Sequence, residues 1–102
     1  MLKTFNEKYG EIQDKEDEYD YKLELIGEYF GKRKRMIKLE EEFFEVIDAY
    51  LRKTDDDLVE ELVDIKVVAD SLIIMLKQNE RGKKIYKHKI DRTIGQIKAG
   101  IL

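Results

Sequence analysis

Two pairs of carboxylates at helical spacing are the residues of this chain best suited to chemistry. Glu42 and Glu45 form the first pair, and Glu61 and Asp64 form the second. Residues three positions apart on an α-helix lie on one face about one turn apart, so each pair can direct both carboxylates to a common centre. Two such helices packed side by side would gather four carboxylates around hard divalent cations such as Mg²⁺ or Mn²⁺. The spacing therefore predicts a metal site.

The second pair lies in a segment that is too apolar to solvate it. Residues 58–76 read LVEELVDIKVVADSLIIML, which places apolar side chains on almost every side of a helix. This pattern predicts a buried helix. An isolated ionised carboxylate there costs on the order of several kcal/mol, so it must be protonated, paired with a base or bound to a metal. The acids of the preceding helix favour the metal.

That preceding helix, expected over residues 32–53, separates apolar from polar side chains. One broad side is apolar and carries Met36, Leu39, Phe43, Val46, Ile47, Tyr50 and Leu51. The opposite side carries Lys38, Glu41, Glu42, Glu45, Asp48 and Ala49. Taken alone, this helix is more typical of an amphipathic helix with a solvated acidic face. Beside the second acidic pair, however, the carboxylates would repel one another and their pKa values would rise unless a cation joined them.

The order of these residues resembles the signature of a known enzyme superfamily. Lys38-Leu-Glu-Glu41-Glu42-Phe-Phe-Glu45, followed by Glu60-Glu61-Leu-Val-Asp64, is similar to the K-x-x-EExxE … EExxD signature of the MazG-like, all-α nucleoside triphosphate pyrophosphohydrolases. Residues 64–72 and the later Lys89-Ile-Asp-Arg92 also resemble segments of small phage and prophage members. The resemblance spans about residues 34–100.

The resemblance implies an all-α, MazG-like helical bundle whose four-helix core is completed by oligomerisation, as a homodimer or homotetramer. It implies hydrolysis of a (d)NTP to a (d)NMP and pyrophosphate. The implied metal ligands, holding Mg²⁺ or Mn²⁺, are Glu42, Glu45, Glu61 and Asp64. Glu41 is the expected catalytic base, taking a proton from the attacking water. Lys38, Lys89 and Arg92 are the expected substrate-binding residues, because their positive charges would offset phosphate charge.

Chain length and apolar content also predict self-association. At 102 residues the chain is one domain. One helix is apolar on almost every side, and a second has a broad apolar arc. Together they have more apolar surface than the remaining helices can cover. Within this single MazG-like domain, we expect residues 1–31 to form a variable N-terminal helical region and residues 32–100 to form the metal-binding core.

Hydrophobic periodicity and capping residues predict the helices themselves. Helices are expected at residues 5–14, 17–30, 32–53, from 58 to between 77 and 82, and 83–98. Thr54 or Asp55 is the expected N-cap of the apolar helix, with Asp57 favourable in its first turn. Gly100 is expected to stop the last helix.

Composition excludes several other classes of protein. Without cysteine, the chain has no disulfide, thiolate nucleophile or thiolate metal site. Its net charge of −3 does not indicate stable nucleic-acid binding. The basic run at residues 32–35 is more typical of a solvated turn than of phosphate contacts, although the resemblance implies that one or two of its residues contact the triphosphate. No apolar stretch reaches the ~18 residues of a membrane span, and the N-terminus lacks the apolar core of a signal peptide. A cytoplasmic location without membrane contact is expected.

One histidine and two rival hypotheses bear on the function. Ferritin-like di-iron bundles need two Glu-x-x-His motifs, whereas His88 is the only histidine and is expected at the surface. The remaining possibility is a site with oxygen ligands alone, which suits Mg²⁺.

Two other functions are compatible with the sequence. One is a non-catalytic helical interaction or regulatory protein, whose acids form a binding face. The other is a degenerate MazG-like protein that binds nucleotides without hydrolysing them.

Overall fold

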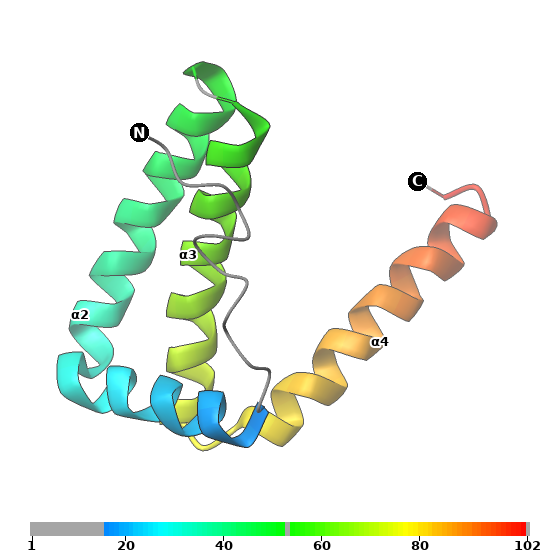
Figure 1. The fold of residues 1–102 in the computed structure, drawn as a ribbon. Coiled ribbons are helices and arrows are strands. Elements are labelled where there is room, and N and C mark those ends of the chain that lie inside the picture. Colours follow the sequence, from blue (N-terminus) through cyan, green and yellow to red (C-terminus); the bar gives the residue numbers. More distant parts are fainter. Residues whose placement is uncertain (1–15, 53, 102) are drawn as a thin grey trace.

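The computed structural model describes residues 16–52 and 54–101. This part of the chain forms α2 (Glu16–Arg52), α3 (Asp55–Met75) and α4 (Asn79–Lys98), and it contains no strand. Figure 1 shows the second half of α2 and α3 as an antiparallel pair, with α4 diverging from them. The all-α fold class is therefore confirmed for the described residues. The helix expected at residues 5–14 lies outside them.

Gly31 bends α2 into two halves. Its φ of 82° and ψ of 160° are not helical, and a positive φ of this kind is tolerated by glycine far better than by residues with a Cβ. The helices predicted at residues 17–30 and 32–53 thus correspond to the two halves of α2, and the non-helical residue falls between them as expected. The first half of α2 crosses near the C-terminal end of α3 (Figure 1).

Two contacts tie the first half of α2 to the end of α3. Gly27 is buried, and a Cβ built on it would lie only 2.9 Å from the Ser71 carbonyl oxygen, so the two backbones approach closely. At the end of α3, Lys77 forms an ion pair with Glu24. The hydrogen bond from Lys77, together with its charge, holds the pKa of Glu24 below its ordinary value. These contacts hold the end of α3 against the first half of α2.

Thr54 begins α3 with a reciprocal cap. The Thr54 hydroxyl accepts from the Asp57 backbone N–H at 3.3 Å, and the Asp57 carboxylate accepts from the Thr54 backbone N–H at 3.4 Å. This capping box satisfies two donors that a helix start otherwise leaves open. The predicted cap is therefore confirmed, with Thr54 rather than Asp55 in the N-cap position.

The apolar core of the described chain is small. Its buried apolar side chains are Ala49, Val68, Leu72 and Ile74. By contrast, Val59, Leu62, Val63 and Val67 of α3 are exposed, as are Met36, Phe43, Phe44, Ile47, Tyr50 and Leu51 of α2. A single chain therefore buries the helix predicted at 58–76 only in part, mainly on the side that packs against α2, and leaves apolar side chains exposed, as expected for more apolar surface than one chain can cover. No helix in the described ranges has the length and apolarity to cross a bilayer.

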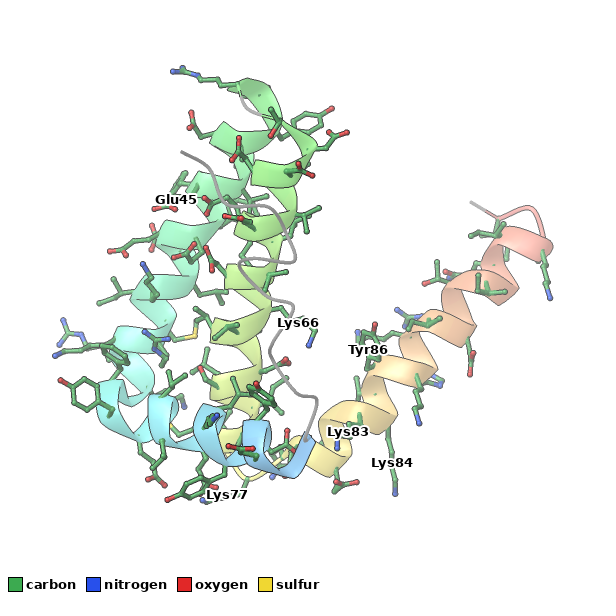
Figure 2. The ribbon with its side chains drawn as sticks, viewed as in Figure 1. Glu45, Lys66, Lys77, Lys83, Lys84 and Tyr86 are labelled. Atoms are coloured by element: carbon green, nitrogen blue, oxygen red, sulfur yellow. The ribbon has the colours of Figure 1, made fainter. Side chains whose placement is uncertain are left out.

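Helix α4 has no buried residue. It contacts α3 near the connection between them, and the described residues include no packing of α4 against α2. Tyr86, Ile90, Ile94 and Ile97 recur at helical spacing along α4 and are all at least 46% exposed. Figure 2 shows Tyr86 on the side of α4 that faces α3. An amphipathic helix of this kind buries its apolar stripe only if something else packs against it.

Glycine-to-alanine substitutions test the close approach of α2 and α3. In Gly27→Ala, the new methyl group would meet the Ser71 oxygen at 2.9 Å and the Met75 Cβ at 3.1 Å, so we expect overpacking to cost about 1–3 kcal/mol. Gly95→Ala is the control, since its Cβ meets nothing within 4 Å and should stabilise the helix by about 0.5–1 kcal/mol. Urea unfolding measures both, and equal effects of the two substitutions would contradict the close approach.

Candidate metal centre

A stripe of charged and small residues on α2 faces α3. Arg35, Lys38, Glu42, Glu45 and Ala49 follow one another at alternating spacings of three and four, which places them on one face of the helix. Of these, Arg35, Glu42 and Ala49 are buried. Much of the apolar arc of α2, including Phe43 and Ile47, therefore faces outward, while Glu42, from the side that the sequence placed opposite this arc, is buried.

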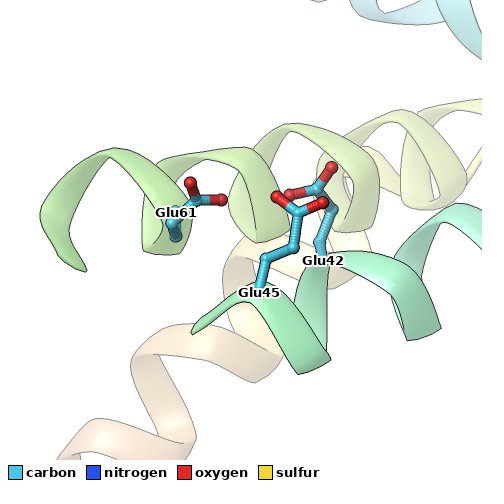
Figure 3. Close-up of side chains that lie close together, drawn as sticks. All are labelled: Glu42, Glu45 and Glu61. Atoms are coloured by element: carbon cyan, nitrogen blue, oxygen red, sulfur yellow. The ribbon is translucent and has the colours of Figure 1, made fainter. Parts of the chain in front are cut away.

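Three carboxylates meet where this stripe passes the first turns of α3. Oxygen atoms of Glu42, Glu45 and Glu61 lie within 4.8 Å of one another, and Figure 3 shows the three side chains converging from the two helices. Glu42 is only 4% exposed. One oxygen of Glu42 and one of Glu61 are buried without any hydrogen-bond donor. Buried carboxylate oxygens without donors are suited to binding a cation.

Asp64 lies beside this cluster rather than within it. It is exposed, and it is not among the residues whose oxygens meet within 4.8 Å. Partial burial, followed by the charges of Glu42 and Glu45, nevertheless raises the pKa of Asp64 above its ordinary value. The structure thus brings together three of the four predicted ligands, with the fourth close enough to share their electrostatic field.

Glu61 is an acid of the cluster whose pKa lies above its ordinary value. Desolvation raises its pKa, and a hydrogen bond with Glu45 and the charges of Glu45, Asp64 and Glu42 raise it further. Each of these causes disfavours the ionised form of Glu61. The expected rise in pKa among crowded acids is thus confirmed for Glu61 and Asp64. A bound cation would offset the negative charges that contribute to these raised pKa values.

Lys38 is the cation that the chain itself places against the cluster. Its Nζ lies 2.9 Å from one oxygen of Glu42 and 3.7 Å from Glu41. The hydrogen bond and charge of Glu42 raise the pKa of Lys38, so this amine is fully protonated at neutral pH. Glu42 therefore has one oxygen engaged by Lys38 and one without a donor, a division of roles that leaves the second oxygen available to a metal.

Other predicted residues lie farther from this cluster. Glu41, the expected base, is exposed and is outside the three-carboxylate cluster, although it contacts Lys38. Lys89 and Arg92 are exposed on α4, which packs on α3 and not on α2 in the described chain, so a single chain does not bring them to the acids. His88 is exposed, as predicted.

The burial of Arg35 differs from the sequence expectation. The basic run at residues 32–35 favours a solvated turn, and the resemblance implies phosphate contacts by one or two of its residues without indicating which, whereas Arg35 is only 7% exposed. The signal was present in the spacing, because Arg35 precedes Glu42 by seven residues and so falls on the same helical stripe. Burial itself could not be inferred, since it depends on how α2 packs at the bend.

No protein-family model matches this chain, and neither the curated proteins nor the solved structures compared with it contain a significant match.

The raised pKa values predict how stability depends on pH without metal. Folded Glu61 and Asp64 keep their protons to higher pH than the ordinary values of 4.5 and 3.8, so the folded state binds more protons in the window above those values. Raising the pH through this window therefore lowers the contribution of these two groups to the free energy of unfolding. In EDTA, Glu61→Gln should be more stable than the wild type at pH 7 and nearly equal to it near pH 4.

Urea unfolding at a series of pH values measures this difference directly. Glu40→Gln is the matched control, because Glu40 is exposed on α2 outside the cluster. A Glu61→Gln effect that does not change with pH, or one that Glu40→Gln reproduces, would contradict the electrostatic account of the cluster.

Proposed function

We propose that this protein is a Mg²⁺-dependent nucleoside triphosphate pyrophosphohydrolase that converts a (d)NTP to a (d)NMP and pyrophosphate. The observation that carries the proposal is the pair of buried carboxylate oxygens without donors, on Glu42 and Glu61, within a cluster of three acids. The resemblance of residues 38–64 to the K-x-x-EExxE … EExxD signature supplies the reaction class.

The donor set supports a hard cation. The chain has no cysteine, and its one histidine is exposed on α4. The possible metal ligands in the cluster are therefore carboxylate oxygens. Oxygen ligands suit Mg²⁺ and Mn²⁺ better than they suit softer metals. Asp64 is the fourth ligand in this proposal, reaching the cation by a change of its side-chain position from α3.

The reaction adds water across the α–β phosphoanhydride. Mg²⁺, when bound, supplies positive charge that neutralises and orients the phosphates. Glu41 accepts a proton as the water oxygen bonds to phosphorus, and the bridging P–O bond breaks with its electrons leaving on the departing phosphate group. Lys38, already protonated between Glu41 and Glu42, offsets phosphate charge beside the cluster.

Self-association into a homodimer or homotetramer is part of the proposal. Its support is the outward apolar surface of the described helices, which a soluble monomer rarely exposes at this extent. Pairing of these surfaces across copies would build a four-helix core. A second copy could also bring its own α4, with Lys89 and Arg92, to the acids that a single chain leaves without them.

Pyrophosphate release from a panel of dNTPs and NTPs, with Mg²⁺, Mn²⁺ or EDTA, tests the reaction. We expect metal-dependent release by the wild type, loss of at least about a hundredfold in Glu61→Gln, and little change in Glu40→Gln, since only the first removes a metal ligand. Metal-independent release, or full turnover by Glu61→Gln, would exclude the site. No release from a folded protein that still binds nucleotides would favour the degenerate relative, and no binding at all would favour the interaction protein.

Light scattering after size exclusion tests the self-association. Ile94→Glu places a charge in the apolar stripe of α4 and should shift the wild-type oligomer toward the monomer, because burying an unpaired carboxylate is costly. His88→Glu introduces the same side chain away from that stripe and should leave the mass unchanged. Since α4 has no buried residue, neither change should unfold the chain, which circular dichroism verifies. A wild-type monomer at all concentrations would contradict the assembly.

A further inference from the structure

A small pocket lies just beyond the bend in α2. Its volume is about 190 Å³, and its lining residues are Phe30, Lys34, Arg35, Ile37, Lys38 and Glu41. Gly31 produces the bend that allows Phe30, before it, and Arg35, after it, to come together. Three of the lining residues are cationic, and the single carboxylate, Glu41, contacts Lys38.

Arg35 is the unusual member of this lining. Its side chain is more than nine-tenths buried, and its Nε has no hydrogen-bond acceptor. The guanidinium carbon lies 4.3 Å from the centre of the Phe30 ring, so the cation packs on an aromatic face. Within the described chain no carboxylate forms an ion pair with it. Burial of an unpaired charge is strongly unfavourable, and an arriving anion would relieve it.

The pocket and the carboxylate cluster are joined by one side chain. Lys38 lines the pocket and also lies 2.9 Å from Glu42, which is a member of the cluster. Arg35, Lys38 and Glu42 share one face of α2, and the seven residues from Arg35 to Glu42 correspond to a rise of about 10 Å. An anion in the pocket would therefore lie along the helix from a cation in the cluster, with Lys38 between them.

We infer that the pocket at the bend of α2 binds a phosphate group, with Arg35 as its principal receptor, and that this group is the outer end of the phosphate chain of the substrate. The planar guanidinium donates to phosphate oxygens in pairs, and Lys34 and Lys38 add the charge that a multiply charged group requires. The identity of the ligand as substrate rests on the proposed function. The binding of phosphate by Arg35 does not.

Calorimetry with pyrophosphate in EDTA, on the full chain, tests the receptor apart from any metal. The wild type should bind pyrophosphate, and Arg35→Gln should weaken binding at least about tenfold, as expected for the loss of charged hydrogen bonds. Arg33→Gln is the matched control. It removes the same charge from an exposed residue two positions away that does not line the pocket, and it should bind nearly as well as the wild type.

Thermal unfolding gives an independent measurement. Without pyrophosphate, Arg35→Gln should be at least as stable as the wild type, because it removes a buried charge that no carboxylate among the described residues pairs. With pyrophosphate, Tm should rise for the wild type and for Arg33→Gln but not for Arg35→Gln. Equal losses of binding in both variants would overturn the assignment, since a general charge effect would then suffice. The assignment would also be overturned if the wild type did not bind pyrophosphate and Arg35→Gln formed a smaller oligomer. A carboxylate of a second copy would then be the partner of Arg35.

Two further comparisons separate the pocket from the reaction. Glu61→Gln should still bind pyrophosphate in EDTA. Full turnover of nucleotide by that variant would contradict the proposed function but not the binding of phosphate in the pocket. For the nucleotide that the wild type hydrolyses best, Arg35→Gln should raise KM more than it lowers kcat. An unchanged KM alongside lost pyrophosphate binding would show that the pocket takes free pyrophosphate, which would overturn its assignment to the substrate.

Discussion

The packing of α2 against α3 along a charged stripe is the constraint on which the rest of this structure depends. Helices normally meet through apolar side chains, whereas here Glu42, Glu45 and Glu61 occupy part of the contact. Their mutual repulsion opposes the packing. Buried apolar side chains on both helices, Ala49 on α2 and Val68 and Leu72 on α3, favour the packing, and Gly27 approaches Ser71 closely near the C-terminal end of α3. These contacts hold the carboxylates near one another.

The same stripe is divided by charge along the axis of α2. Its end near the bend carries Arg35 and Lys38, and its far end carries the carboxylates. Lys38 belongs to both, since it lines the basic pocket and pairs with Glu42. One helix face thus offers a place for a cation and a place for an anion about two turns apart. A metal-bound phosphate chain has this combination of charges, which is why the two features support a single kind of ligand.

Because charged residues occupy part of the helix contact, the apolar core is small and many apolar side chains are exposed. Phe43, Ile47 and Tyr50 on α2 and Val59, Leu62 and Val63 on α3 are all exposed, and α4 contributes a further apolar stripe. In a chain this small, the few buried apolar side chains supply little of the free energy that folding needs. The buried charged residues and the exposed apolar residues are therefore two consequences of one arrangement, and pairing of copies would reconcile both with a stable fold.

Local features of the fold followed from the sequence. Helical periodicity placed Glu42 with Glu45 on one face, Thr54 had the side chain and the partner at Asp57 for a cap, and Gly31 and Gly100 allowed the positive φ angles at which a helix bends or ends. Each of these depends on residues within about one helical turn, where backbone geometry leaves few alternatives.

The relative placement of the helices was decided only by the tertiary structure. Glu61 rather than Asp64 enters the cluster because the rotation of α3 about its axis determines which acid points toward α2. The periodicity of the sequence does not specify that rotation. Arg35 becomes buried because the bend at Gly31 brings Phe30 against it. Lys89 and Arg92 stay away from the acids because α4 diverges after a short turn. The sequence by itself determined which residues share a helix face, while the tertiary structure determined which faces meet, because that choice depends on contacts between residues far apart in the chain.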